Sequence, residues 1–226
     1  MGLETSTQSN KIFATVISDG SIRVKVDENT PGAVKREYED RDKIKHEKWE
    51  KVYQSLTGII TSIKFKDSDF GQFLDIEIND IILSLNTDGG FAQDLMKKLP
   101  KVDLSGDVKL APYAFTTESG KNLKGITVYQ NNEKLTSFFW DGENSINGLP
   151  VVTKEEGAKY KKDNWKIFFT TVKMFLIDYT EKNIIPKIKS KDEQFKETLD
   201  KAGIAYTDIT PDDSMEDSFD PSSIPF

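Results

Sequence analysis

Aromatic and basic residues recur on the same predicted faces of several short segments. Two predicted hairpins carry such groups: Phe13 with Arg23 and Lys25, and Lys64 and Lys66 with Phe73. Basic side chains neutralise phosphates, and aromatic rings stack on unpaired bases of any sequence. The combination predicts a surface that binds single-stranded nucleic acid without reading its sequence.

Two further groups extend this candidate set. On a strand near the middle of the chain, Lys109, Tyr113 and Phe115 would alternate outward, or inward if the register is displaced by one residue. A Lys-rich stretch carries the rest, namely Lys43, Lys45, Lys48, Trp49, Lys51 and Tyr53. An aromatic residue of a β-protein belongs to the core more often than to a binding surface, so the set carries more weight than any member.

Catalytic patterns are absent from the sequence. The chain has no cysteine and one histidine, His46, which excludes disulfides and thiolate metal sites and leaves little for a His-based triad. The acids Asp67, Asp69, Asp75, Glu77 and Asp80 resemble the carboxylate cluster of a metal-dependent nuclease, but a turn and an exposed strand face explain them better. We therefore predict no enzymatic activity, no metal and no cofactor.

The negative charge of the chain is concentrated at one end. The net charge is −7, and residues 207–226 hold six acids and no Lys or Arg. Removing those six from the 38 acids leaves 32 against 31 basic residues, a net of about −1 for the rest, which is compatible with a basic surface on one face. An acidic segment of this kind is either an interaction segment or an aid to solubility.

Alternation of apolar and polar residues between turn signals predicts a mainly β fold. The predicted strands are residues 12–16, 22–26, 56–66, 72–79, 81–85, 108–115, 123–130 and 133–140. The predicted helices are residues 91–99 with Pro100 behind them, an amphipathic helix over 159–179 that packs on the core, and 192–201. Residues 33–56 are either a helix or a long mobile loop with a helical or extended end.

These elements predict an α+β protein built on an OB-type Greek-key β-barrel with an additional C-terminal helix. Its helix at 91–99 falls where an OB fold carries one, between the third and fourth strands. We expect a disordered leader over residues 1–10, one domain over 11–206 and a disordered acidic tail over 207–226. No apolar run is long enough to span a membrane, and residues 1–11 lack the pattern of a signal peptide, so we expect a cytoplasmic protein without membrane contact.

The end of the chain resembles the C-terminal tip of bacterial single-stranded DNA-binding proteins, in which an acidic stretch ends in Ile-Pro-Phe. The matching residues are the acids Asp212, Asp213, Glu216, Asp217 and Asp220 and the tip Ile224, Pro225 and Phe226. One departure is that Pro221, Ser222 and Ser223 separate the acids from the tip. The resemblance implies that Phe226 fills an apolar pocket on replication, recombination or repair proteins, while the acids steer the tail to a basic rim.

A second resemblance lies in the body of the chain. Residues 49–60, followed by 63–66 and 70–76, are similar to bacteriophage-encoded single-stranded DNA-binding proteins with an OB fold, over about a sixth of the sequence. It implies single-stranded DNA as the ligand and, for a phage protein, the cytoplasm of a bacterial host. The alternative is an adaptor that binds no nucleic acid and docks on a partner through its tail. The sequence leaves open whether the protein is a homo-oligomer.

Overall fold

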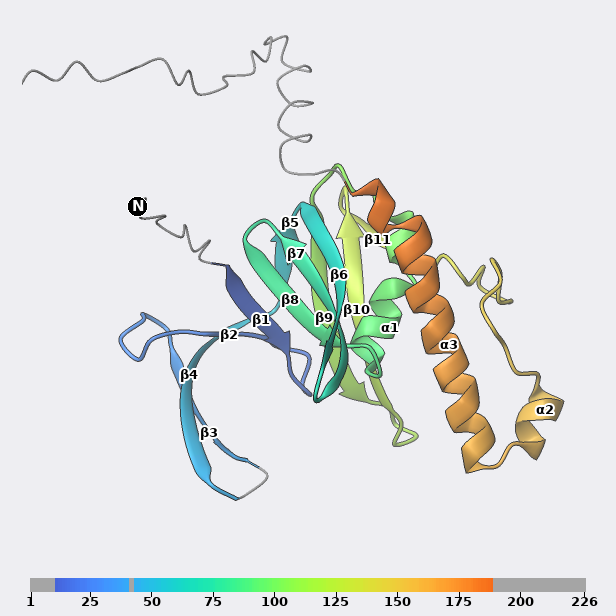
Figure 1. Cartoon of the computed structure of the whole chain (residues 1–226), viewed down its shortest axis with the longest axis horizontal. Helices are drawn as coiled ribbons and strands as arrows, with labels where there is room; N and C mark the ends of the chain where they lie inside the picture. The colour runs from blue at the N-terminus through green and yellow to red at the C-terminus, as the bar shows by residue number, and fades with distance from the viewer. Residues whose placement is uncertain (1–10, 41–42, 189–226) are drawn as a thin grey trace, which may run out of the picture. The chain divides into compact units, whose positions relative to one another are not determined.

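Strands are the commonest regular element of the structure, a computed structural model that describes residues 11–40 and 43–188. These residues belong to the first of the two units into which the chain divides, Met1–Ser190 and Lys191–Phe226. The fold is α+β and mostly strand, as predicted, and the helices of the described residues all follow β8 in the chain (Figure 1).

The strands form two sheets. The larger has the order β3-β4-β2-β1-β8-β7-β6 and the smaller the order β11-β10-β9-β5. The bounds in the larger sheet are β1 Ile12–Val16, β2 Ile22–Lys25, β3 Val34–Glu39, β4 Lys45–Tyr53, β6 Ile60–Ser68, β7 Gly71–Ile78 and β8 Ile81–Asn86. Those in the smaller sheet are β5 Leu56–Gly58, β9 Val108–Thr116, β10 Asn122–Gln130 and β11 Glu133–Leu135. All pairs in the two sheets are antiparallel except β1 with β8, which are parallel.

Five helical segments accompany the sheets. They are α1 Gly90–Met96, the short 3₁₀ turn η1 Leu99–Lys101, α2 Lys154–Lys159, α3 Lys162–Asn183 and the 3₁₀ turn η2 Ile185–Lys187. The predicted helix at 91–99 is α1, although Pro100 lies inside η1 rather than behind the helix. The helix predicted over 192–201 lies outside the described residues.

The predicted helix or loop over residues 33–56 is wrong. Residues 34–53 form the β3–β4 hairpin, in which Val34 pairs with Glu50 and Tyr38 with His46. Its turn is closed by the Asp40 carboxylate, which accepts a hydrogen bond from the Ile44 amide at 2.9 Å, and Lys43 adopts a left-handed φ of 61°. In Figure 1 this hairpin lies on the side of the sheet away from α3.

The strand predicted over residues 56–66 is two strands in two sheets. Its first part, β5, pairs with β9, and its second, β6, pairs with β7. The change occurs at Gly58, whose φ of 152° and close approach to the Asn79 side chain suit glycine. Because the register also shifts between Ile60 and Ser62, Ile60 and Ile63 are both buried, although they were predicted to face opposite ways.

The core lies against the apolar faces of the strands. The fully buried residues include Ala14, Leu74, Ile76, Ile78, Leu83, Leu110, Ile126 and Val128. The C-terminal half of α3 packs on this core with Val172, Leu176 and Ile177. Its aromatic residues meet Phe139, which is fully buried, with the Phe139 ring 5.0 Å from the Tyr179 ring.

The last predicted strand, 133–140, ends early at Leu135. The Phe138 amide instead donates to the Lys97 carbonyl at 2.7 Å, and Phe138 and Phe139 turn toward α3. Burial of these two rings against the helix therefore replaces the expected strand pairing.

Candidate nucleic-acid interface

The register of the larger sheet places six of the predicted residues on one face. Phe13 is in register with Ile82, Thr15 with Arg23, and Lys66 with Phe73, while Ala14, Leu83 and Leu74 point to the opposite, core side. The open face, as we name the side away from the core, contains Phe13, Arg23, Lys25, Lys64, Lys66 and Phe73. Both hairpin groups from the sequence therefore lie on a single surface.

Exposure differs among these residues. Phe13 is 62% exposed, and Lys25, Lys64 and Lys66 are also exposed, whereas Phe73 is partly buried. A groove of about 710 Å³ runs along the ends of β1 and β2 and is lined by Phe13 and Lys25, among others. An apolar ring beside an ammonium group in a groove is the arrangement that a stacked base and its phosphate require.

The open face also carries acids. Asp75 accepts a hydrogen bond from the Ser84 hydroxyl at 2.5 Å, and Asp75 is the cross-strand partner of Lys64. Glu77, 8% exposed, forms an ion pair with Lys11 at 2.6 Å. The centre of the face is therefore close to neutral, and its positive charge is concentrated toward the edge strands.

The Lys-rich stretch is divided by the β4 register. Lys48 shares the open face, because Arg23 pairs with Val52 and Lys25 with Glu50. The other predicted residues of the Lys-rich stretch that lie in β4 point to the opposite face of the sheet: Lys45, Trp49, Lys51 and Tyr53. Lys43 lies exposed in the β3–β4 turn.

Glu50 organises the positive charges at this edge. Its carboxylate, 3% exposed, receives Lys48 Nζ at 2.6 Å, Arg36 Nε at 2.9 Å and Arg23 Nη1 at 3.0 Å. Burial on its own raises the pKa of Glu50, but the hydrogen bonds from Lys48, Arg36 and Arg23 outweigh it and lower the pKa from 4.5 to about 2. The three cations and one carboxylate of this cluster sum to a net charge of +2, and Asp19, 3.8 Å from the Arg23 guanidinium, lies beside it.

Sequence reasoning missed three residues beside this cluster. Tyr38 stacks on His46 with 5.3 Å between ring centroids, and the Arg36 guanidinium lies 5.5 Å from the Tyr38 ring. Lys48 Nζ lies 5.6 Å from the same ring. Residues 34–39 and 45–53 carry charged side chains on both faces of the hairpin, so no apolar alternation marked them as strands.

The predicted group on β9 lies on the outer side of the smaller sheet. Lys109 and Phe115 are exposed, the latter by 53%. Tyr113 covers Gly125 across the strands, and burial, with hydrogen bonding to Asp94, raises the pKa of its hydroxyl. Tyr113 is thus committed to packing, whereas Phe115 presents its ring. Phe70, 69% exposed in the β6–β7 turn, is another aromatic that the sequence did not single out.

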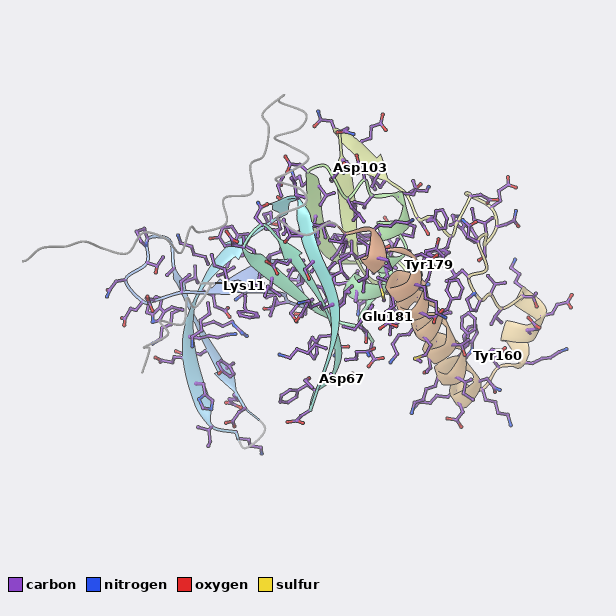
Figure 2. All side chains as sticks on the ribbon, turned by 45° about the horizontal axis from the view of Figure 1, so that its top comes forward. Lys11, Asp67, Asp103, Tyr160, Tyr179 and Glu181 are labelled. Carbon is purple, nitrogen blue, oxygen red and sulfur yellow. The ribbon has the colours of Figure 1, made fainter. Side chains whose placement is uncertain are left out.

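A separate apolar surface lies at the start of α3. We name it the α3 patch: Tyr160, Trp165, Ile167, Phe168 and Phe169. The predicted packing of this helix on the core is confirmed for its C-terminal half, whereas in its first turns Ile167 is 66% and Phe169 55% exposed. Figure 2 shows Tyr160 near this end of α3 and Tyr179 toward the other end.

The predicted interaction residues of the tail lie outside the described residues: Asp212, Asp213, Glu216, Asp217, Asp220, Ile224, Pro225 and Phe226. Among the helices of residues 11–40 and 43–188, none is long and apolar enough to cross a membrane. The same residues contain no group of three or more His, Asp or Glu side chains that could hold a metal ion.

Comparison of the chain with protein-family models, with curated proteins and with solved structures found no match.

Proposed function

We propose that the protein binds single-stranded DNA through the open face, without base specificity. The observation that carries the proposal is the shared register of β1, β2, β6 and β7, which gathers Phe13, Lys25 and Phe73 with Lys64 and Lys66 on one side of the sheet. The Phe13 ring is 62% exposed and is therefore accessible for stacking on a base, and the ammonium groups of the lysines can neutralise phosphates.

We also propose that part of the fold is an OB-type arrangement. Strands β5 and β6 together would be its first strand, since they pair with both β9 and β7. The meander β6-β7-β8, the helix α1 and the hairpin β9-β10 then follow in the order of an OB fold. The free edge of β8 pairs with β1, so four N-terminal strands extend the sheet beyond these five.

This arrangement supports the location of the ligand. OB folds bind oligonucleotides on the face of their second and third strands and with the loops that follow the first and fourth strands. Here those are the β7–β8 part of the open face, the β6–β7 turn with Phe70 and the β9–β10 turn beside Phe115.

An oligo-dT titration at several salt concentrations tests the proposal. We expect binding at low salt that weakens steeply as salt rises, because phosphate contacts release counterions. Phe13→Ser should weaken binding by about 1–3 kcal/mol, the range for one stacked base. Trp140→Ser, at an aromatic that is 49% exposed in a different part of the fold, is the matched control and should leave affinity unchanged. An unaltered protein that fails to bind oligo-dT at low salt would exclude the proposal.

We further propose that the tail recruits replication, recombination or repair proteins through Ile224, Pro225 and Phe226. An apolar ring on an acidic segment suits an apolar pocket with a basic rim. Phe226→Ala should abolish capture of such proteins and leave oligo-dT affinity unchanged. Phe219→Ala, which removes the other aromatic of the last 20 residues, is the control, and equal loss in both variants would contradict a specific tip.

The second candidate function is an adaptor that binds no nucleic acid. The observation in its favour is the α3 patch, since an exposed cluster of aromatic side chains is typical of a protein-binding surface. The same oligo-dT titration separates the two functions, because an adaptor has no affinity for the oligonucleotide.

A further inference from the structure

The two faces of the β3–β4 hairpin differ in charge. Cross-strand pairing places Arg36 opposite Lys48 and Tyr38 opposite His46 on the open face, next to Glu50. The other face has as many acids as bases, because its charged members are Lys35, Glu37, Glu39, Lys45, Glu47 and Lys51. On the open face Arg36, Lys48 and Glu50 leave a net charge of about +1 beside the stacked Tyr38 and His46 rings, on a hairpin that lies outside the five OB-like strands.

The cations of this side keep donors that Glu50 does not use. Arg36 directs Nε and Nη2 to the Glu50 carboxylate, at 2.9 and 3.3 Å, which leaves Nη1. Lys48 makes one contact with Glu50, so two of its three N–H groups remain. Both side chains stay about one-third exposed, 33% for Arg36 and 29% for Lys48, whereas Arg23 is 17% exposed. Glu50 thus fixes the orientation of two accessible cations without neutralising them.

An aromatic surface adjoins those donors. Tyr38 is 40% exposed and stacks on His46, whose Nε2 is held by Asp40 at 2.7 Å. Arg36 and Lys48 both lie within 5.6 Å of the Tyr38 ring centre. A phosphate on the two cations would therefore bring its own sugar and base against the Tyr38–His46 pair.

From this geometry we infer that the β3–β4 hairpin is a second nucleotide subsite, in which Arg36 and Lys48 hold a phosphate and the attached base packs on the Tyr38–His46 pair. The inference rests on the proposed function, since it names where a strand bound to the central sheet continues. The seven strands of the larger sheet, at about 4.8 Å spacing, span roughly 29 Å from β6 to β3. We expect one DNA strand to cross this width and to contact both the central strands and the hairpin.

Two substitutions and their controls test the subsite. Lys48→Gln should lower the affinity for an oligo-dT of about 25 nucleotides, long enough to exceed a single OB site, and reduce the slope of log affinity against log salt by about 0.7. Lys35→Gln removes the same charge from the opposite face of the same hairpin and should change neither. Tyr38→Leu should weaken binding about fivefold or more, the lower end for one stacked base, and Tyr38→Trp should restore it. Circular dichroism and a thermal melt on each variant verify that the hairpin variants are folded.

A measurement on the unaltered protein avoids dependence on folding of the variants. Photocrosslinking to an oligo-dT that contains 4-thiothymidine, followed by peptide mapping, should place crosslinks within residues 36–48 as well as on the open-face strands. Crosslinks confined to β1, β6 and β7, or equal affinities for Lys48→Gln and Lys35→Gln, would overturn the subsite and leave the proposed function standing. Absence of any oligo-dT binding by the unaltered protein would remove the proposed function itself.

Discussion

Glu50 connects three strands through one carboxylate, and its ionisation makes stability depend on pH. The folded protein holds the pKa near 2 against 4.5 for the free side chain, so the stabilisation is complete above about pH 4.5 and is lost as the pH falls toward 2. Glu50→Gln should lower the free energy of unfolding at pH 7 by about 3 kcal/mol, because Arg23, Arg36 and Lys48 lose their counter-charge.

Urea denaturation at pH 7 and pH 3 measures this effect. The variant should lose less stability than the unaltered protein between the two pH values. Glu133→Gln, an exposed carboxylate on β11, is the control and should behave like the unaltered protein. Parallel pH dependence of Glu50→Gln and the unaltered protein would contradict the role given to Glu50.

Gly125 is required by close packing rather than by backbone conformation. A Cβ at this position would meet the Asp94 carboxylate and the Tyr113 hydroxyl. Gly125→Ala should therefore destabilise the protein by about 1–3 kcal/mol through overpacking. Gly157→Ala in α2 is the matched control, since its Cβ would meet Trp165 at 3.4 Å, an ordinary contact, and alanine favours a helix. Equal melting temperatures for Gly125→Ala and Gly157→Ala would show that the Asp94 and Tyr113 side chains can move away from a Cβ at position 125 without a loss of stability.

Part of the candidate site could be predicted at the level of residues. Phe13 and Lys25 were placed on one face correctly because the period of two in a strand is readable in the sequence. Arg36 and Tyr38 were missed because no apolar alternation marks their strand. Which aromatics are exposed depends on long-range packing, as Tyr113 shows by covering a glycine of the neighbouring strand.

Among the elements, α1 has a second role beyond filling the core. Asp94 accepts a hydrogen bond from the Ile126 amide at 2.8 Å, and Lys98 donates to the Ile126 carbonyl at 2.6 Å. Asp94 in α1 and Lys98 just after it thereby provide hydrogen-bond partners for the amide and the carbonyl of Ile126 on the edge of β10.

Removing this contact should destabilise the smaller sheet. Asp94→Ala leaves the Ile126 amide without its acceptor and removes one of the two acceptors of Lys98, and we expect a loss of about 1.5–3 kcal/mol in the free energy of unfolding. Asp88→Ala breaks the more exposed pair with Lys173 and should cost less than about 1 kcal/mol. Urea denaturation compares the two, and equal losses would mean that the cap on β10 contributes little.

Elements with local signals were predicted well and those shaped by distant contacts were not. The hairpins of β1 with β2 and of β9 with β10 follow their alternation and turn residues. The division of residues 56–66 between two sheets depends on partners some fifty positions apart, Leu56 with Leu110 among them, and a window of neighbouring residues contains no such information.

For the molecule as a whole, charge is divided between the body and the last 20 residues. Deleting residues 207–226 changes the formal net charge from −7 to about −1. We expect oligo-dT affinity to rise a few fold at low salt, where charges are weakly screened, and to be unchanged at high salt. The melting temperature should not change, since the core of the described residues lies upstream.

A full-length variant with the six acids of residues 207–226 changed to Asn or Gln is the control for this deletion. It should reproduce the gain in affinity if charge is the cause. A folded truncation that no longer binds oligo-dT would instead assign these residues to the DNA site.

The parallel pairing of β1 with β8 restricts the order in which the chain can fold. Ile12 pairs with Ile81, about seventy positions later, so β1 cannot form this pairing until the other strands of the larger sheet have been synthesised. Contacts of such sequence separation raise contact order and slow folding. Until β8 is synthesised, β1 keeps an unpaired backbone edge, along which it could pair with the strand of another chain and aggregate.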